Sequence, residues 1–164
     1  MIAYKFLRAD GTGVFTGFRW PLPDGAPAAW VEGDADPCRS GIHACRVSDL
    51  PLWLGRTLYA MELDGDILHE PSKVVGTRGR LLRRIDAWDD ARDAYTRMCA
   101  DRAHELARDA ELPEWDAVVE PSLPEGPALL GFIAARIAEA ISGPAAYQGE
   151  RARQAEWLAG RLGL

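Results

Sequence analysis

Two cysteines, a histidine and a serine lie close together in the segment 38–45, whose sequence is Cys-Arg-Ser-Gly-Ile-His-Ala-Cys. A thiol beside an imidazole is the arrangement from which a cysteine nucleophile is built, because the imidazole can accept the thiol proton. If this segment is extended, the side chains of His43 and Cys45 share one face. We therefore predict His43 and Cys45 as catalytic residues and Ser40, in the same segment, as a ligand-binding residue.

Two other interpretations of this segment stay open. Two thiolates and an imidazole, from Cys38, Cys45 and His43, supply three of the four ligands of a structural zinc site, which makes a zinc-stabilised domain one alternative. The spacing C-x4-H-x-C is not a familiar one, and no second Cys/His pair lies nearby, so we predict no metal. The other alternative is purely structural, with both cysteines buried in the core and the histidine hydrogen-bonded there.

Basic residues are concentrated in the segment that follows residue 72, and Lys73, Arg78 and Arg80 are predicted to bind a ligand. Arg78 and Arg80 share a face if the segment is extended, and two guanidiniums on one face suit a phosphate or a carboxylate. We predict that Arg78 and His43 line one shared cavity. The alternative is that the arginines form salt bridges with the acidic residues of 87–120.

An acid and several aromatic residues complete the predicted site. Glu62 would act as a general acid or base if its strand lies next to that of His43. Tyr59 precedes Glu62 by three residues on the same strand, and we include it among the ligand-binding candidates. Trp20 and Trp53 flank the 38–45 segment and are predicted to form the aromatic wall of a pocket.

Hydrophobic periodicity changes part-way along the chain. Alternation with a period of two predicts strands before residue 86, with Asp64-Gly65 as a hairpin turn, and a period of 3.6 predicts helices after it. This order predicts an α+β fold, in which residues 1–86 form a mixed or antiparallel sheet with one short helix and residues 87–164 form about three helices packed on it in the same domain. The predicted strands are 4–8, 14–20, 29–32, 57–63 and 73–85, and the predicted helices are 49–54, 86–110, 129–141 and 146–161.

Charge and composition limit the classes of partner. The chain has 164 residues and a net charge of −6, and residues 87–164 alone carry 14 acidic and 8 basic residues. This balance argues against general nucleic-acid binding, and no apolar run is long enough to span a membrane. The N-terminal sequence lacks the layout of a signal peptide, so we expect a cytoplasmic protein. An acidic helical half could also serve as the contact surface for a protein partner.

The 38–45 segment resembles the C-x-S-G-h-H-A-C signature (h is apolar) of an uncharacterised bacterial and phage domain family. In that family the signature follows a lysine-bearing strand, which here corresponds to Ala3-Tyr4-Lys5-Phe6. The resemblance covers about residues 3–86 and implies no activity.

A fainter similarity is to the ADP-ribosyltransferase-like build, with Gly41, the helix around Leu50–Leu54 and the strand Tyr59–Glu62 in corresponding places. The Ser-Thr-Ser triplet and the Glu-x-Glu pair of that family are absent from this sequence. The similarity therefore implies a transferase-like fold that lacks the catalytic motif of that family. From all these features we expect a pocket for a small anionic or nucleotide-like ligand. Whether the domain is an enzyme stays open, and the sequence identifies no cofactor.

Overall fold

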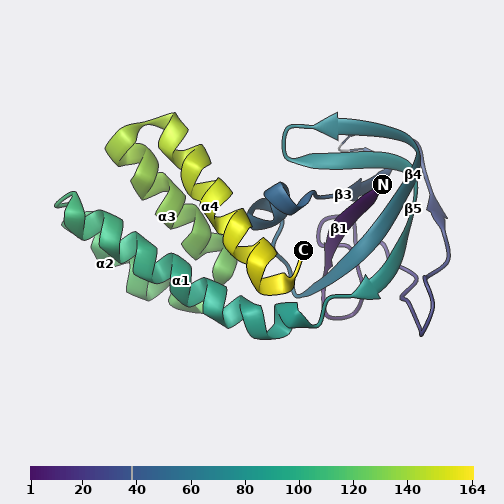
Figure 1. Ribbon diagram of the computed structural model, residues 1–164, viewed down its shortest axis with the longest axis horizontal. Coiled ribbons are helices and arrows are strands. Elements are labelled where there is room, and N and C mark those ends of the chain that lie inside the picture. The colour runs from purple at the N-terminus through teal and green to yellow at the C-terminus, as the bar shows by residue number, and fades with distance from the viewer. Residues whose placement is uncertain (38) are drawn as a thin grey trace. The chain divides into compact units, whose positions relative to one another are not determined.

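The computed structural model describes residues 1–37 and 39–164, which divide into two compact units (Figure 1). The first unit comprises residues 1–88 and the second residues 89–164. All the strands of the described chain belong to the first unit, and the second contains only helices. The predicted α+β class, with strands preceding helices, is confirmed.

The sheet of the first unit is antiparallel at every described pairing. The long strands β4 and β5 form a hairpin, β1 pairs with the outer edge of β4, and both β2 and β3 pair with β5. Beyond these ladders, a bridge with two backbone hydrogen bonds of 2.8 Å joins Tyr4 of β1 to Cys45. The sheet therefore curls until the residue after β3 meets β1. The strands are β1 (Ile2–Leu7), β2 (Val31–Glu32), β3 (Ile42–Ala44), β4 (Thr57–Glu70) and β5 (Lys73–Arg84).

Alternation along β1 places three residues on the inner face of this curled sheet. Ala3 and Leu7 have no exposed surface, and Lys5 lies between them on the same face because side chains in a strand alternate. The opposite face of β1 is also covered, since Phe6 packs edge to face against Trp88 with ring centroids 5.2 Å apart. Lys5 is thus a charged residue at a position where the strand otherwise carries core side chains.

The predicted strand 14–20 is wrong, because this segment folds into turns held by isolated bridges. Gly17 adopts a φ of +66°, and its N–H donates to the carbonyl of Gly13 at 3.0 Å. The Thr16 hydroxyl accepts a hydrogen bond from the N–H of Phe18 at 3.2 Å, as serine and threonine do in turns. Local hydrogen bonding therefore takes the place of strand pairing.

The predicted hairpin turn at Asp64-Gly65 is also wrong. β4 continues through these residues to Glu70, and the chain reverses at Pro71 and Ser72. The register against β5 shifts between residues 64 and 67, and Gly65 has a φ of +74°, which glycine adopts without strain. The turn-forming dipeptide is thus used for a β-bulge inside a strand.

The predicted short helix 49–54 is the 3₁₀ helix η1 (Val47–Leu52), and its N-cap is Arg46. Asp49 lies near the start of η1, and its carboxylate accepts hydrogen bonds from the backbone N–H of Arg46 at 3.1 Å and from Arg46 Nε at 2.6 Å. The Asp49 carboxylate therefore satisfies the backbone N–H of the N-cap residue, as the acid at the third helical position does in a capping box.

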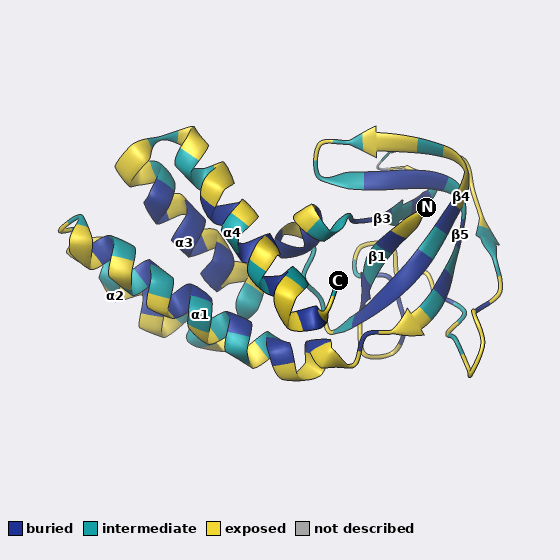
Figure 2. Cartoon of the chain, in the orientation of Figure 1, coloured by how far each residue is buried: buried dark blue, intermediate teal, exposed yellow. Residues whose placement is uncertain are grey.

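The second unit contains four α-helices where the sequence predicted about three. The additional helix, α2, begins at Pro113, a position where proline is tolerated because the first helical N–H has no partner. α1, α3 and α4 each have a buried and an exposed side (Figure 2), whereas α2 has a single buried residue, Val119. The elements are α1 (Ala87–Asp109), α2 (Pro113–Ser122), the 3₁₀ turn η2 (Leu123–Glu125), α3 (Pro127–Ser142) and α4 (Pro144–Leu162).

A buried polar network joins three of these helices. Gln154 of α4 donates to the carbonyl of Gly131 in α3 at 3.0 Å and accepts from the Tyr95 hydroxyl of α1 at 3.1 Å. Arg151 Nη1 donates to the same Gln154 oxygen at 3.0 Å. A Cβ at Gly131 would lie 3.0 Å from the Tyr95 hydroxyl oxygen, so glycine leaves room for the network.

Candidate functional site

A cavity with a volume of about 560 Å³ lies within the first unit. Its walls come from β1, the 13–20 loop, β2 and the segment around β3. β1 pairs with β4 along its length. It meets the segment around β3 through the Tyr4–Cys45 bridge, and the 13–20 loop and the segment around β3 line the cavity together with β1. The volume lies within the range of small-molecule sites.

Cationic side chains dominate the polar lining of this cavity. The chain contains two lysines, Lys5 and Lys73, and both line it, together with Arg39 and His43. Glu32 is the one acidic residue among the described residues of the lining. Its carboxylate lies 3.6 Å from the guanidinium of an arginine on β5. Basic side chains therefore outnumber acidic ones among the described residues of the lining.

The amine of Lys5 is held between two neighbouring groups. Its Nζ donates a hydrogen bond to the backbone carbonyl of His43 at 2.5 Å and lies 4.6 Å from the centre of the Trp20 ring. Burial lowers the pKa of Lys5 to about 8, because a charged amine loses its hydration there, and a smaller opposing effect comes from Cys45. An appreciable fraction of the amine is therefore neutral near physiological pH.

Aromatic rings supply much of the apolar lining. Phe18 contacts Trp20 edge to face at 5.6 Å, and Phe15 contacts Trp53 in the same way at 5.7 Å. Trp53 is fixed by its indole N–H, which donates to the carbonyl of Ser72 at 2.6 Å. Lys73 Nζ lies 6.0 Å from the Trp53 ring centre, so each lysine of the cavity is paired with a tryptophan.

His43 lies in β3 opposite Val75 and lines the cavity, as predicted for a site residue. Burial, followed by the charges of Lys73 and Lys5, lowers the pKa of His43 below its ordinary value, so the ring is neutral at pH 7. Gly41 lets the chain turn into β3, since its φ is +98° and a Cβ there would lie 2.5 Å from the carbonyl oxygen of Asp34.

The geometry does not support the predicted nucleophilic role of Cys45. Its side chain is buried, and Sγ donates to the carbonyl of Tyr4 at 3.3 Å. Burial, with a further effect of Asp49, raises the pKa of Cys45 to about 12, so the thiol stays protonated at neutral pH and is a poor nucleophile. Cys38 lies outside the described residues. Among the residues that are described, no group of three or more His, Cys, Asp or Glu could hold a metal.

Glu62 and Arg80 form an ion pair with each other and do not meet the other predicted site residues at the cavity. They face one another across β4 and β5, and Arg80 Nε donates to the Glu62 carboxylate at 2.9 Å. Neither is among the described residues lining the cavity, and the same holds for Tyr59, which is buried in the core of the sheet. The predicted acid–base role of Glu62 beside His43 therefore does not fit this geometry.

Arg78 is not among the described residues that line the cavity with His43, contrary to the predicted shared site. Its guanidinium stacks over Trp30 at 4.2 Å and lies 3.6 Å from Glu32 and 3.7 Å from Asp64. The alternative prediction was that the arginines pair with acidic residues of 87–120. The carboxylates near Arg78 are instead those of Glu32 and Asp64, which belong to the sheet unit. Of the predicted site, the cavity unites Trp20, Ser40, His43, Cys45, Trp53 and Lys73.

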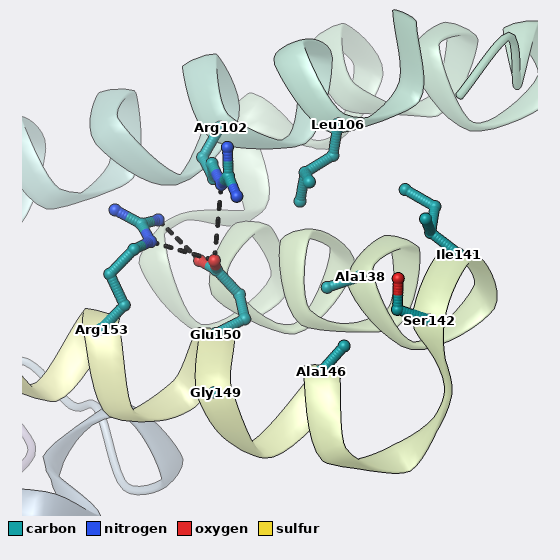
Figure 3. A pocket seen from close by; sticks show the side chains of 9 residues that line it. All are labelled: Arg102, Leu106, Ala138, Ile141, Ser142, Ala146, Gly149, Glu150 and Arg153. Carbon is teal, nitrogen blue, oxygen red and sulfur yellow. Dashed lines mark hydrogen bonds and ion pairs between the residues drawn. The ribbon is translucent and has the colours of Figure 1, made fainter. Parts of the chain in front are cut away.

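A second cavity, of about 310 Å³, lies within the helical unit (Figure 3). Its polar side is occupied by Glu150, whose side chain is 3% exposed and points toward Arg102 and Arg153. Arg153 donates to the carboxylate from Nε at 2.9 Å and from Nη2 at 2.6 Å, and Arg102 Nε lies 3.5 Å away. The acid in this cavity is already matched by protein cations, so the arrangement is that of a structural ion pair.

Sequence reasoning missed Lys5 as a site residue. The signal was present in the alternation of the first strand, where a lysine occupies the face that Ala3 and Leu7 bury. Lysine is almost never fully buried without a partner, so a lysine at an inward position indicates a functional or paired amine. Phe15 and Phe18 were missed for another reason, since their segment was predicted as a strand.

No protein family model, no curated protein and no solved structure matches this chain. The assignment of the site therefore depends on its geometry and chemistry. In the described part of the chain, no helix combines the length and the apolar character of a membrane span.

Proposed function

We propose that the sheet unit binds a small anionic ligand with a planar ring, similar in size to a mononucleotide. The observation that carries this proposal is that both lysines of the chain line one aromatic cavity. Lysine is a compact cation that binds phosphate and carboxylate groups as a point charge. Tryptophan and phenylalanine side chains offer flat apolar surfaces against which a planar ring can pack.

The placement of the two lysines indicates how such a ligand would be recognised. Lys73 Nζ lies over Trp53, and Lys5 Nζ lies over Trp20, so positive charge and ring surface are adjacent at two points of the wall. A ligand that carries a phosphate next to a ring can use both features at once. A free phosphate uses the charge alone, and an uncharged nucleoside uses the rings alone.

Isothermal titration of the full chain with four probes tests this combination. We expect adenosine 5′-monophosphate or pyridoxine 5′-phosphate to bind in the micromolar range, and adenosine and inorganic phosphate to bind at least about tenfold more weakly, a difference of about 1.4 kcal/mol. Lys73→Gln should weaken binding of the ring phosphates about 10- to 100-fold, because it removes a charge-assisted contact.

The matched control is Arg83→Gln, which also removes one positive charge from β5. Arg83 is exposed and is not one of the described residues of the cavity lining. It should leave affinity within about twofold, since long-range effects of exposed charges are screened by salt. Equal losses in the two variants, or no binding of either ring phosphate at millimolar concentration, would contradict the proposal.

A further inference from the structure

We propose that Lys5 forms an imine with the carbonyl group of an anionic aldehyde or ketone bound in this cavity. This inference rests on the proposed function and specifies the ligand class of the same site. Its geometric basis is the position of the Lys5 amine, which is held at the wall of a cavity by the His43 carbonyl at 2.5 Å. An amine that is fixed by one hydrogen bond can present its lone pair to a bound carbonyl.

The surroundings of Lys5 make its amine a better nucleophile than an ordinary lysine. Removal from water favours the neutral form, and a pKa of about 8 leaves roughly one amine in ten neutral at pH 7, against fewer than about one in a thousand for an exposed lysine. Desolvation in an apolar pocket, or a neighbouring cation, is how lysines are activated for carbonyl chemistry. Trp20 supplies the apolar surface here.

The charged groups around the amine are compatible with this role. The described lining contributes Lys73 and Arg39 as cations, and His43 is neutral at pH 7. Cys45 stays a protonated thiol, so it does not compete as a thiolate for the carbonyl or pair with the amine. The lysine is the reactive nucleophile of the lining at neutral pH, in place of the cysteine that the sequence suggested.

The reaction balances without an oxidant or a reductant. The lone pair of neutral Nζ forms a bond to the carbonyl carbon, while the carbonyl π electrons move to oxygen. One proton passes from nitrogen to that oxygen to give a carbinolamine. Loss of one water molecule then yields the imine, so that amine and carbonyl give imine and water. Water reverses the reaction, which is why the product must be trapped for detection.

The test compares two ligands that differ only at the reacting carbon. Pyridoxal 5′-phosphate carries an aldehyde, and pyridoxine 5′-phosphate carries an alcohol at the same position. The full chain is incubated with the aldehyde, reduced with sodium borohydride and digested, and the adduct is located by peptide mass spectrometry. The competing amines are few, since the chain has only Lys73 and the N-terminal amine besides Lys5.

We expect the adduct on Lys5 to form at least about tenfold faster than that on Lys73, because burial lowers the pKa of Lys5 and favours its neutral, nucleophilic amine. The rate should rise with pH and level off above about pH 8, near the pKa of Lys5. Pyridoxine 5′-phosphate should bind and protect Lys5 from the aldehyde. Lys5→Arg keeps a donor for the His43 carbonyl, and it should lose the adduct while binding the alcohol within about tenfold of wild type, because its positive charge remains.

Two results would overturn the inference, and they are distinguishable. If the alcohol binds but the adduct forms on Lys73 or the N-terminal amine, or persists in Lys5→Arg, the imine is wrong and the ligand site stands. If neither phosphate binds at millimolar concentration, the imine and the proposed function both fail for this ligand class. Should the arginine variant fold poorly, Lys5→Met tests the adduct alone, because it lacks the positive charge of the binding site: loss of the adduct supports the imine, and an adduct that persists in this variant overturns it.

Discussion

The two cavities described above differ in the charged groups that line them. In the helical unit, Glu150 is enclosed and receives two hydrogen bonds from Arg153, with Arg102 close by. In the sheet unit, two lysines and an arginine line a cavity together with a single described acid, which itself lies near another arginine. A cavity acid that protein cations already bind is structural, whereas basic groups gathered in the wall of an aromatic cavity favour an anionic ligand.

Removing the acid of the helical cavity should have the largest effect. Burial alone would raise the pKa of Glu150, but hydrogen bonds from Arg153 and Gln154, with the charges of Arg153 and Arg102, hold it below its usual value. Glu150→Gln leaves two arginines facing a neutral amide, and it should destabilise the fold by about 2–3 kcal/mol, less than a fully buried pair because both arginines are about a third exposed.

The matched control for that experiment is Glu139→Gln, which breaks another i,i+3 pair of the same unit. Glu139 pairs with Arg136, whose side chain is 47% exposed. Its loss should cost less than about 0.5 kcal/mol, as is typical of surface pairs. Urea unfolding followed by circular dichroism measures both variants. Similar changes for the two would show that the helical cavity is not built around its acid.

Replacing Lys5, in the cavity of the sheet unit, should change stability in the opposite direction. Lys5→Met removes an amine whose charged form is disfavoured in the folded state, and we expect a gain of about 1–2 kcal/mol at pH 7, after allowance for the lost hydrogen bond and for partial exposure. Because the folded pKa, about 8, is below the unfolded value, wild type binds fewer protons when folded between these two values. The advantage of the variant should therefore shrink as pH rises above about 8.

Differential scanning calorimetry of wild type and Lys5→Met across this pH range gives the comparison directly. Lys73→Met serves as the control, because Lys73 lies at the start of β5 with a half-buried side chain. If Lys5→Met destabilises the protein by more than about 1 kcal/mol at pH 7, the lysine is a structural tie between β1 and β3 and not a residue kept for function.

The smallest expected effect comes from a surface histidine of the helical unit. His104 Nδ1 lies 2.6 Å from Asp116, and this hydrogen bond is the main cause that raises the pKa of His104 above its ordinary value. Because the pKa of His104 is higher in the folded than in the unfolded state, the contact with Asp116 contributes fully to stability below about pH 6.5. This contribution is lost as pH rises through the folded pKa. Thermal melts of wild type and His104→Gln should therefore converge at alkaline pH, and a constant difference would show that the contact is not ionic.

Sequence patterns were sufficient where local periodicity decides the structure. The change from a period of two to a period of 3.6 near residue 86 placed the strands and helices in the correct order, because apolar side chains must face a core whichever element carries them. The same rule located β5 and α1 to within two residues at each end. It failed at 14–20 and at Asp64-Gly65, where turn hydrogen bonds and a bulge override the local pattern.

The candidate site was only partly predictable. Trp20, His43, Trp53 and Lys73 were singled out from residue type and do line one cavity. The roles predicted for Cys45, Glu62 and Arg78 depended on neighbours that are distant in sequence, and those neighbours are a carbonyl, an arginine and a tryptophan. Charge and reactivity are set by burial and by partners across the sheet, which residue spacing does not report.

What the sequence determined by itself is the kind of element at most positions and the presence of reactive side chains around residue 43. What the tertiary structure decided is which of them share a cavity and in which protonation state. The curling of the sheet joins Tyr4 to Cys45, and this brings Lys5 of the first strand to the carbonyl of His43, which lies 38 residues away along the chain. Withdrawal from water then favours the neutral amine at Lys5 and the protonated thiol at Cys45, because low polarity disfavours charge on either group.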